Sequence, residues 1–187
     1  MNNVLELLNH EIEDEWSRLI KEFATVSRDE FRWQPGSRLH SIGWHVRHAI
    51  EWRYALVHVW IAGHSAEEKL CCLGWEKEPL VQNISVNRGW YEPHFTPAET
   101  LEFLEWVRRQ TRQDLALISQ TRYSDILTFP WRTNSVFHEI MQDVRHSALH
   151  RGHIRQLKKM IAEQYGANAV LRTREQVQPT PSSFPLQ

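Results

Sequence analysis

Two histidines four residues apart form the clearest chemical motif of this chain. His146 and His150 lie in a segment with a helical period, so their imidazole rings share one face of a helix. Two imidazoles at this spacing can reach a single metal ion. Leu157 and Ile161 continue the same face further along the segment. The apolar continuation indicates that the histidine pair points into the protein interior.

A third histidine, His48, is in a position to complete such a site. It lies on the apolar stripe of an earlier helical segment, beside Trp44 and Trp52. Helix bundles build metal sites from inward-facing side chains on separate helices. Three histidines that leave a fourth position open are typical of catalytic metal sites, where the open position holds water or a substrate atom. We therefore predict a metal site formed by His48, His146 and His150.

These histidines also have a simpler interpretation. A buried histidine is more often a hydrogen-bonded core residue than a ligand, and a helical pair at this spacing also arises by chance. Other potential ligands lie within a turn or two, namely His45, His138, Asp143 and His153. Gly152 costs its helix about 1 kcal/mol relative to alanine. It therefore indicates a close approach of a backbone, side chain or ligand, unless it only permits tight helix packing.

Four long segments with a helical period must position these residues. They cover residues 4–23, 41–62, 96–118 and 136–165. Ser41 is the expected N-cap of the second segment, and Thr96 to Glu99 form a capping box at the start of the third. No hairpin pattern is strong enough to predict a sheet. The fold class predicted is all-α, a four-helix bundle with a long crossover from about 64 to 95.

Composition and sequence patterns exclude several classes of function and of cellular location. The 187 residues carry 22 Lys and Arg against 23 Asp and Glu, a net charge of −1, so no basic field exists for nucleic acid or anionic lipid. No apolar run reaches membrane-spanning length, and the N-terminal segment is acidic rather than basic. The adjacent Cys71 and Cys72 favour a reducing, cytoplasmic setting. We expect one domain over residues 1–166 and a Pro/Ser-rich tail over 167–187.

Two motifs together resemble a known family. The run His146-x-x-x-His150-Arg151-Gly152 resembles the fourth-helix motif of the DinB/YfiT-like metal-binding four-helix bundles, which usually reads HxxxHRGQ. The region 33–48, with its Pro-Gly turn, Ser41 and His48, is similar to the second-helix region of that family. The resemblance covers about residues 1–165. His153 stands where the family usually has Gln, and we expect it not to bind a metal directly.

The resemblance implies a fold, a cofactor and a partner. The fold is an up-down-down-up bundle whose long crossover joins the second and third helices. The cofactor is a divalent metal, commonly zinc or nickel, held by the positions that correspond to His48, His146 and His150. Members often form homodimers. Those of known activity are mycothiol-dependent isomerases or S-transferases that use bacillithiol or mycothiol, and a related domain occurs in ergothioneine-forming enzymes.

The expected function is therefore a metal- and thiol-dependent transferase or isomerase that acts on a small electrophile. Trp44 is expected to bind the substrate, as one of several tryptophans that wall a pocket, together with Trp75, Trp90 and Trp131. Arg151 is expected to contact a carboxylate or phosphate of the thiol or substrate. An interhelical salt bridge explains Arg151 equally well.

Two other functions stay open at this stage. A glutamate near the ligands would favour a metal-assisted hydrolase, and Glu51 and Glu139 are the obvious helix-borne candidates. A non-catalytic, stress-related bundle would use the metal only to stabilise its helices. No partner of the nucleic-acid or membrane class is expected in either case.

Overall fold

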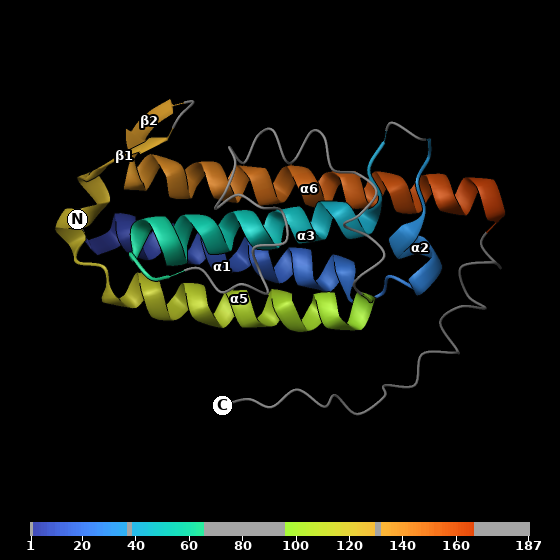
Figure 1. The fold of residues 1–187 in the computed structure, drawn as a ribbon, viewed down its shortest axis with the longest axis horizontal. Helices are drawn as coiled ribbons and strands as arrows, with labels where there is room; N and C mark the ends of the chain where they lie inside the picture. Colours follow the sequence, from blue (N-terminus) through green and yellow to red (C-terminus); the bar gives the residue numbers. More distant parts are fainter. Residues whose placement is uncertain (1, 37–38, 66–95, 130–131, 167–187) are drawn as a thin grey trace.

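The fold is known from a computed structural model, which describes residues 2–36, 39–65, 96–129 and 132–166. Four long helical segments form its body (Figure 1). They are α1 (Asn2–Phe23), α3 (Ile42–Arg53) with its continuation η1 (Tyr54–Ile61), α5 (Pro97–Leu117) and α6 (Val136–Tyr165). The protein is thus mostly helical, as predicted from the period of its apolar residues.

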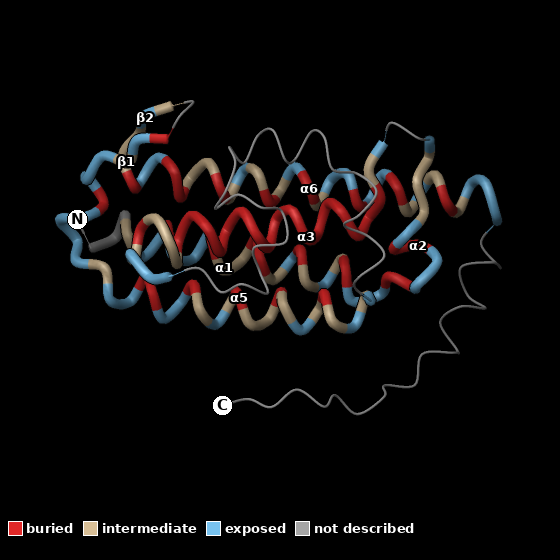
Figure 2. The backbone as a smooth tube through the Cα atoms, viewed as in Figure 1, coloured by how far each residue is buried: buried red, intermediate tan, exposed pale blue. Residues whose placement is uncertain are grey.

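The long helices pack side by side around a shared core. α6 packs against α1 and α3, and α5 packs against the other sides of the same two helices. In Figure 1, α1 and α6 run in one direction along the molecule, while α3 and α5 run in the opposite direction. α3 is therefore enclosed between α5 and α6, and Figure 2 shows it buried along its whole length.

The predicted helix starts are confirmed. The Ser41 hydroxyl accepts a hydrogen bond from the Trp44 backbone N–H at 3.1 Å and caps α3. At the start of α5, the Thr96 hydroxyl accepts from the Glu99 backbone N–H, and the Glu99 carboxylate accepts from that of Thr96. α6 ends at Gly166, whose φ of 77° is readily adopted only by glycine.

Four short elements differ from the sequence-based expectation. The expectation of no sheet was wrong, because β1 (Ile126–Phe129) and β2 (Arg132–Ser135) pair antiparallel before α6. Each strand has four residues, too few for a period of two to stand out. A short helix, α2 (Arg28–Arg32), follows α1, and a 3₁₀ turn, η3 (Gln120–Ser124), precedes β1.

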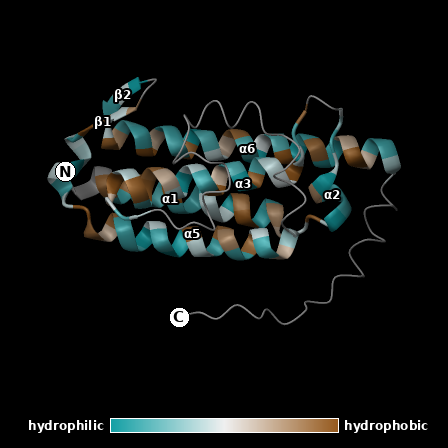
Figure 3. Cartoon of the chain, in the orientation of Figure 1, coloured by the Kyte–Doolittle hydropathy of each residue, from teal (hydrophilic) through white to brown (hydrophobic). Residues whose placement is uncertain are grey.

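The second predicted helix changes character along its length. After Arg53 its hydrogen bonds become those of a π-helix, in which Ala62 N–H donates to the carbonyl of Val57. This η1 stretch is strongly hydrophobic (Figure 3) and joins a core cluster with residues of α1 and α6. π-helical stretches are uncommon in proteins and often occur at functional sites.

Large apolar side chains fill the space between the helices. Trp16, Leu19, Ile50 and Ile154 are fully buried in one cluster, and the Trp16 indole N–H donates to the Leu104 carbonyl at 3.0 Å. No helix within the described ranges combines the length and apolarity needed to cross a membrane.

Some predictions fall on residues outside the described ranges. They concern most of the 64–95 crossover, the cysteine pair and the tail 167–187, together with the three tryptophans Trp75, Trp90 and Trp131. The domain boundary at 166 stays a prediction, because residues 167–187 lie outside the described ranges.

Candidate metal centre

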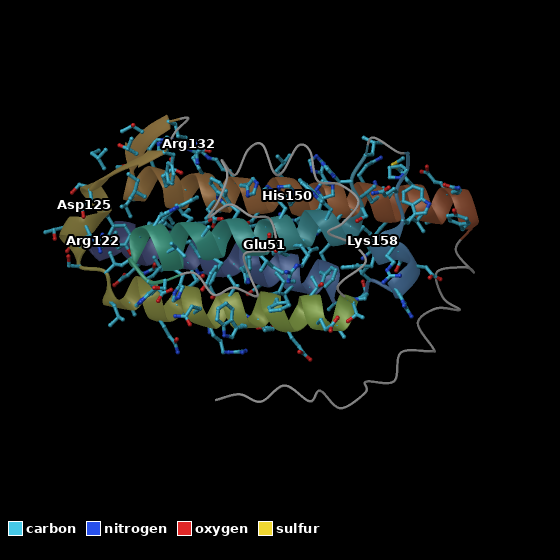
Figure 4. All side chains as sticks on the ribbon, in the orientation of Figure 1. Glu51, Arg122, Asp125, Arg132, His150 and Lys158 are labelled. Atoms are coloured by element: carbon cyan, nitrogen blue, oxygen red, sulfur yellow. The ribbon has the colours of Figure 1, made fainter. Side chains whose placement is uncertain are left out.

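The three histidines predicted to form a metal site lie together where α3 packs on α6. Nε2 of His146 lies 3.0 Å from Nε2 of His48 and 2.9 Å from Nε2 of His150. Each of the three residues offers one ring nitrogen within 4.8 Å of the others. Figure 4 labels His150 in the middle of α6, next to α3. The helical spacing of four residues therefore brings both rings of α6 to the one ring of α3.

Hydrogen bonding alone does not satisfy this arrangement. A neutral imidazole has one N–H and one lone pair, so the Nε2 atom of His146 can serve one neighbour as donor or acceptor but not both. At least one of its two short contacts therefore lacks a proper hydrogen bond. A metal ion that accepts lone pairs from all three Nε2 atoms would satisfy the whole set. Zinc-bound imidazole nitrogens lie about 2.0–2.1 Å from the ion and thus about 3.3 Å apart, close to the observed separations.

His45 makes a buried contact with the ring of His150, on the opposite ring edge from Nε2. Its Nδ1 lies 2.9 Å from Nδ1 of His150, on the ring edge that faces away from His146. Such a contact fixes the tautomer of a metal-binding histidine, since the nitrogen that does not bind the metal keeps its proton and donates it. His153 is exposed, and its ring centre lies 4.7 Å from that of His45. His45, His150 and His153 therefore form a second possible ligand group that shares one residue with the first.

The surroundings keep the clustered imidazoles neutral. Burial, together with the neighbouring imidazole of His146, holds the pKa of His48 well below its usual range. The pKa of His150 is lowered by burial and by His48 and His146. Burial also lowers the pKa of His146, against the opposing effect of Asp143, and it lowers the pKa of His45 to about 3. Neutral imidazole is the form that binds metals, so the site is prepared for a cation.

Two tryptophans enclose the histidines. The Trp44 ring stacks on His48 with centres 4.9 Å apart and on His40 with centres 3.5 Å apart. The Trp52 ring lies 5.6 Å from that of His146. Trp44 is 3 % exposed, and its indole N–H has no hydrogen-bond partner in the described part of the chain. The predicted substrate residue Trp44 thus lies at the candidate metal centre with an unused donor.

Arg151 points away from this centre. Its guanidinium donates to both carboxylate oxygens of Glu15 on α1, at 2.6 and 3.0 Å. Both side chains are mostly buried. The sequence allowed two roles for Arg151, a contact with thiol or substrate and an interhelical salt bridge. The structure contains the salt bridge.

The other candidate ligands and bases already have partners. Asp143 pairs with Arg53 in the core, and His138 contacts Gln142 on the exposed side of α6. Glu51 pairs with Arg47 inside α3. Glu139 accepts hydrogen bonds from Arg132 and Asn134 of β2.

Within the described residues, no backbone or side chain approaches Gly152 closely. A Cβ at this position would meet no described atom within 4 Å. The close approach occurs instead at Gly43, where a Cβ would lie 2.7 Å from the Phe31 ring. α2 can pack closely on α3 because residue 43 lacks a side chain.

Sequence reasoning missed a third group of possible ligands, formed by His58, His64 and Asp114. His58 and His64 are six residues apart, which is not a helical ligand spacing. Asp114 lies on a different helix, and nothing in the sequence pairs it with the two histidines. The only available hint was Gly63, a residue that can reverse the chain after a helix.

One protein family matches this chain. The family model described as DinB superfamily matches residues 11–154, most of the chain and all three histidines of the candidate centre. No curated protein matches the sequence.

Proposed function

The chain belongs to the DinB superfamily, and we propose that it is a metal-dependent enzyme that uses a low-molecular-weight thiol. The ligands in this proposal are His48, His146 and His150. The preferred ion is divalent zinc or nickel, which imidazole nitrogens bind well. The up-down-down-up topology of the family belongs to the same proposal, and the common direction of α3 and α5 supports it.

The observation that carries the proposal is the meeting of three Nε2 atoms on two packed helices. His146 cannot satisfy both of its short contacts by hydrogen bonding. Three protein ligands leave a fourth position free, which is the arrangement of catalytic rather than structural metal sites. A purely structural role for the metal is therefore the less favoured alternative.

When bound, a divalent ion at this site would stabilise the thiolate form of a thiol, the form that reacts as a nucleophile. Such a thiolate would attack an electrophilic carbon of the second substrate and form a C–S bond. The leaving group would depart with the electron pair of the bond that breaks, and the thiol proton would pass to solvent. The thiols implied by family resemblance are bacillithiol and mycothiol.

The protein contributes orientation and an apolar environment. Trp44 and Trp52 cover two of the histidine rings and keep water away from them. The unused indole N–H of Trp44 is available to a thiol or substrate oxygen. His45 holds the ring of His150 through the Nδ1 contact. These residues position the ligands and bind the reactants, whereas the sulfur of the thiol would form the new bond.

A hydrolase is less well supported. A carboxylate base near the ligands would favour hydrolysis at such a metal. Glu51 and Glu139, the two helix-borne candidates, are fully buried and engaged by Arg47 and by Arg132. Neither carboxylate is available to take a proton from water.

Cobalt substitution tests the proposal directly. The full chain is stripped of metal, loaded with Co²⁺ and titrated with bacillithiol, mycothiol or 2-mercaptoethanol, and the absorption spectrum is recorded. Thiolate binding to Co²⁺ is expected to produce a new near-ultraviolet charge-transfer band and a shift of the visible bands. Ethylene glycol, which lacks sulfur, is the matched control ligand, and His138→Ala is the matched control variant because His138 is exposed.

The His146→Ala variant should lose the response to thiol and the part of the visible absorption that comes from the three-histidine site. If Co²⁺ binds to the wild type but no thiol changes its spectrum, the thiol-dependent function is wrong. If Co²⁺ instead binds equally well to His146→Ala, the ligand assignment is wrong.

A further inference from the structure

Besides the centre between α3 and α6, α3 carries a second cluster of metal-binding side chains at its η1 end. His58 of η1, His64 just after it and Asp114 of α5 each offer one ligand atom within 4.8 Å of the others. This cluster lies against α5, whereas the first centre lies against α6. Ten residues separate His48 from His58, about 15 Å along a helix, so the two groups share no ligand.

The backbone folds back to bring His64 over His58. Gly63 has a φ of 80°, a left-handed conformation that favours glycine. Its N–H donates to the Val59 carbonyl, and the His64 N–H donates to the His58 carbonyl at 3.1 Å. As a result the two imidazoles stack with ring centres 4.5 Å apart. The π-helical end of this segment therefore places the His58 and His64 rings beside the same neighbouring side chain.

That neighbour is a buried carboxylate. Oδ2 of Asp114 lies 2.8 Å from Nδ1 of His58, and Oδ1 lies 3.5 Å from Nε2 of His64. The amide of Gln110 donates to Oδ1 at 3.0 Å. Asp114 is 1 % exposed, and in the described ranges it has no Arg or Lys partner. Burial of a carboxylate is costly unless hydrogen-bond donors or a cation compensate it, and a metal ion held by Asp114 and the two imidazoles would do so.

From these contacts we infer that His58, His64 and Asp114 form a second site for a divalent transition metal. Two imidazoles and one carboxylate are a ligand set for ions such as zinc, nickel or cobalt, whereas magnesium and calcium prefer all-oxygen sites. His58 approaches Oδ2 of Asp114 at 2.8 Å and His64 approaches Oδ1 at 3.5 Å, so both imidazoles lie close enough to the carboxylate to share one ion with it. His64 is about half exposed, which gives an ion a path from solvent.

Metal stoichiometry tests this inference independently of the proposed function. The full chain is stripped with a chelator, equilibrated with Zn²⁺ alone, freed of unbound ion and analysed for zinc per chain. We expect two ions in the wild type, one in His64→Ala, one in His146→Ala, and none in the double variant. His138→Ala is the control for loss of an exposed imidazole and should keep both ions.

His64→Ala is the main variant because its side chain is the most exposed of the three, so its removal should leave the fold intact. Asp114→Asn serves as a second variant, with circular dichroism to check folding, and it should also lose one ion. Two ions retained in His64→Ala would overturn the inference. So would loss of the second ion in His153→Ala, since that result would assign it to His45, His150 and His153.

The failures of the two proposals are distinguishable. A wild type with one ion that disappears in His64→Ala but not in His146→Ala would support the second site and reject the first. One ion with the opposite dependence would reject the second site alone.

Discussion

The Nδ1 atoms of His45 and His150 lie 2.9 Å apart in the buried contact between α3 and α6. If Nε2 of His150 is to bind a metal, its Nδ1 must carry the proton and donate it to His45. His45→Ala is therefore expected to weaken metal binding about 10- to 100-fold without removing a ligand.

Competition with a chelator of known affinity measures this effect for wild type and variant. His45→Asn, whose amide oxygen can accept the same proton, should recover part of the affinity. Equal metal affinity in wild type and His45→Ala would show that the contact does not orient His150.

Trp44 lies at the candidate centre with an indole N–H that lacks a partner in the described part of the chain. Trp44→Phe keeps an aromatic ring against His48 but removes the donor. We expect unchanged metal content and a thiol affinity about tenfold weaker, as for the loss of one hydrogen bond. Thiol titration of the cobalt protein measures it. Unchanged thiol affinity would exclude a ligand contact by the Trp44 N–H.

The ion pair of Arg151 with Glu15 joins α6 to α1. Arg151→Ala leaves the buried Glu15 carboxylate without its partner, so the free energy of unfolding should fall by about 3 kcal/mol. Urea unfolding measures it. Arg151→Met combined with Glu15→Leu removes both charges and should restore most of the stability. A variant with normal stability and weakened thiol binding would instead support the predicted substrate role of Arg151.

Glu13 gives a stability contribution that depends on pH. Burial raises its pKa, but the hydrogen bonds from Arg112 and Arg108 outweigh this effect, so the folded-state pKa lies below the ordinary value of 4.5. A lowered folded-state pKa stabilises the protein above about pH 4.5, and the contribution is lost as the pH falls through the lowered pKa.

Glu13→Gln should therefore reduce the free energy of unfolding by about 1 kcal/mol at pH 7, and this difference should shrink in acid. Urea unfolding of both proteins between pH 7 and pH 3.5 checks it. Glu11→Gln, which changes an exposed carboxylate of the same helix, should have no comparable effect. A difference that stays constant with pH would contradict the assignment.

The sequence predicted those features that depend on local spacing. Ser41 and the Thr96–Glu99 box mark helix starts by contacts within four residues, and both are present. The positions of His146 and His150 on one helix face follow from the helical period alone. Their meeting with His48 could be anticipated because all three lie on apolar stripes, which must face the core.

Features that depend on tertiary packing could not be predicted. The partner of Arg151 lies on α1, far away in sequence, so the choice between ion pair and substrate contact had no local basis. The same holds for Asp114, which meets His58 only because α5 packs on η1. The π-helix and the four-residue strands have no strong periodic pattern of their own.

The most direct test of the central claim is anomalous diffraction from crystals of the full chain grown after purification without added metal. We predict a peak about 2.0–2.1 Å from Nε2 of each of His48, His146 and His150, at the absorption edge of zinc or nickel. Crystals with no anomalous peak among these three atoms, both as purified and after soaking in Zn²⁺ or Ni²⁺, would contradict the claim.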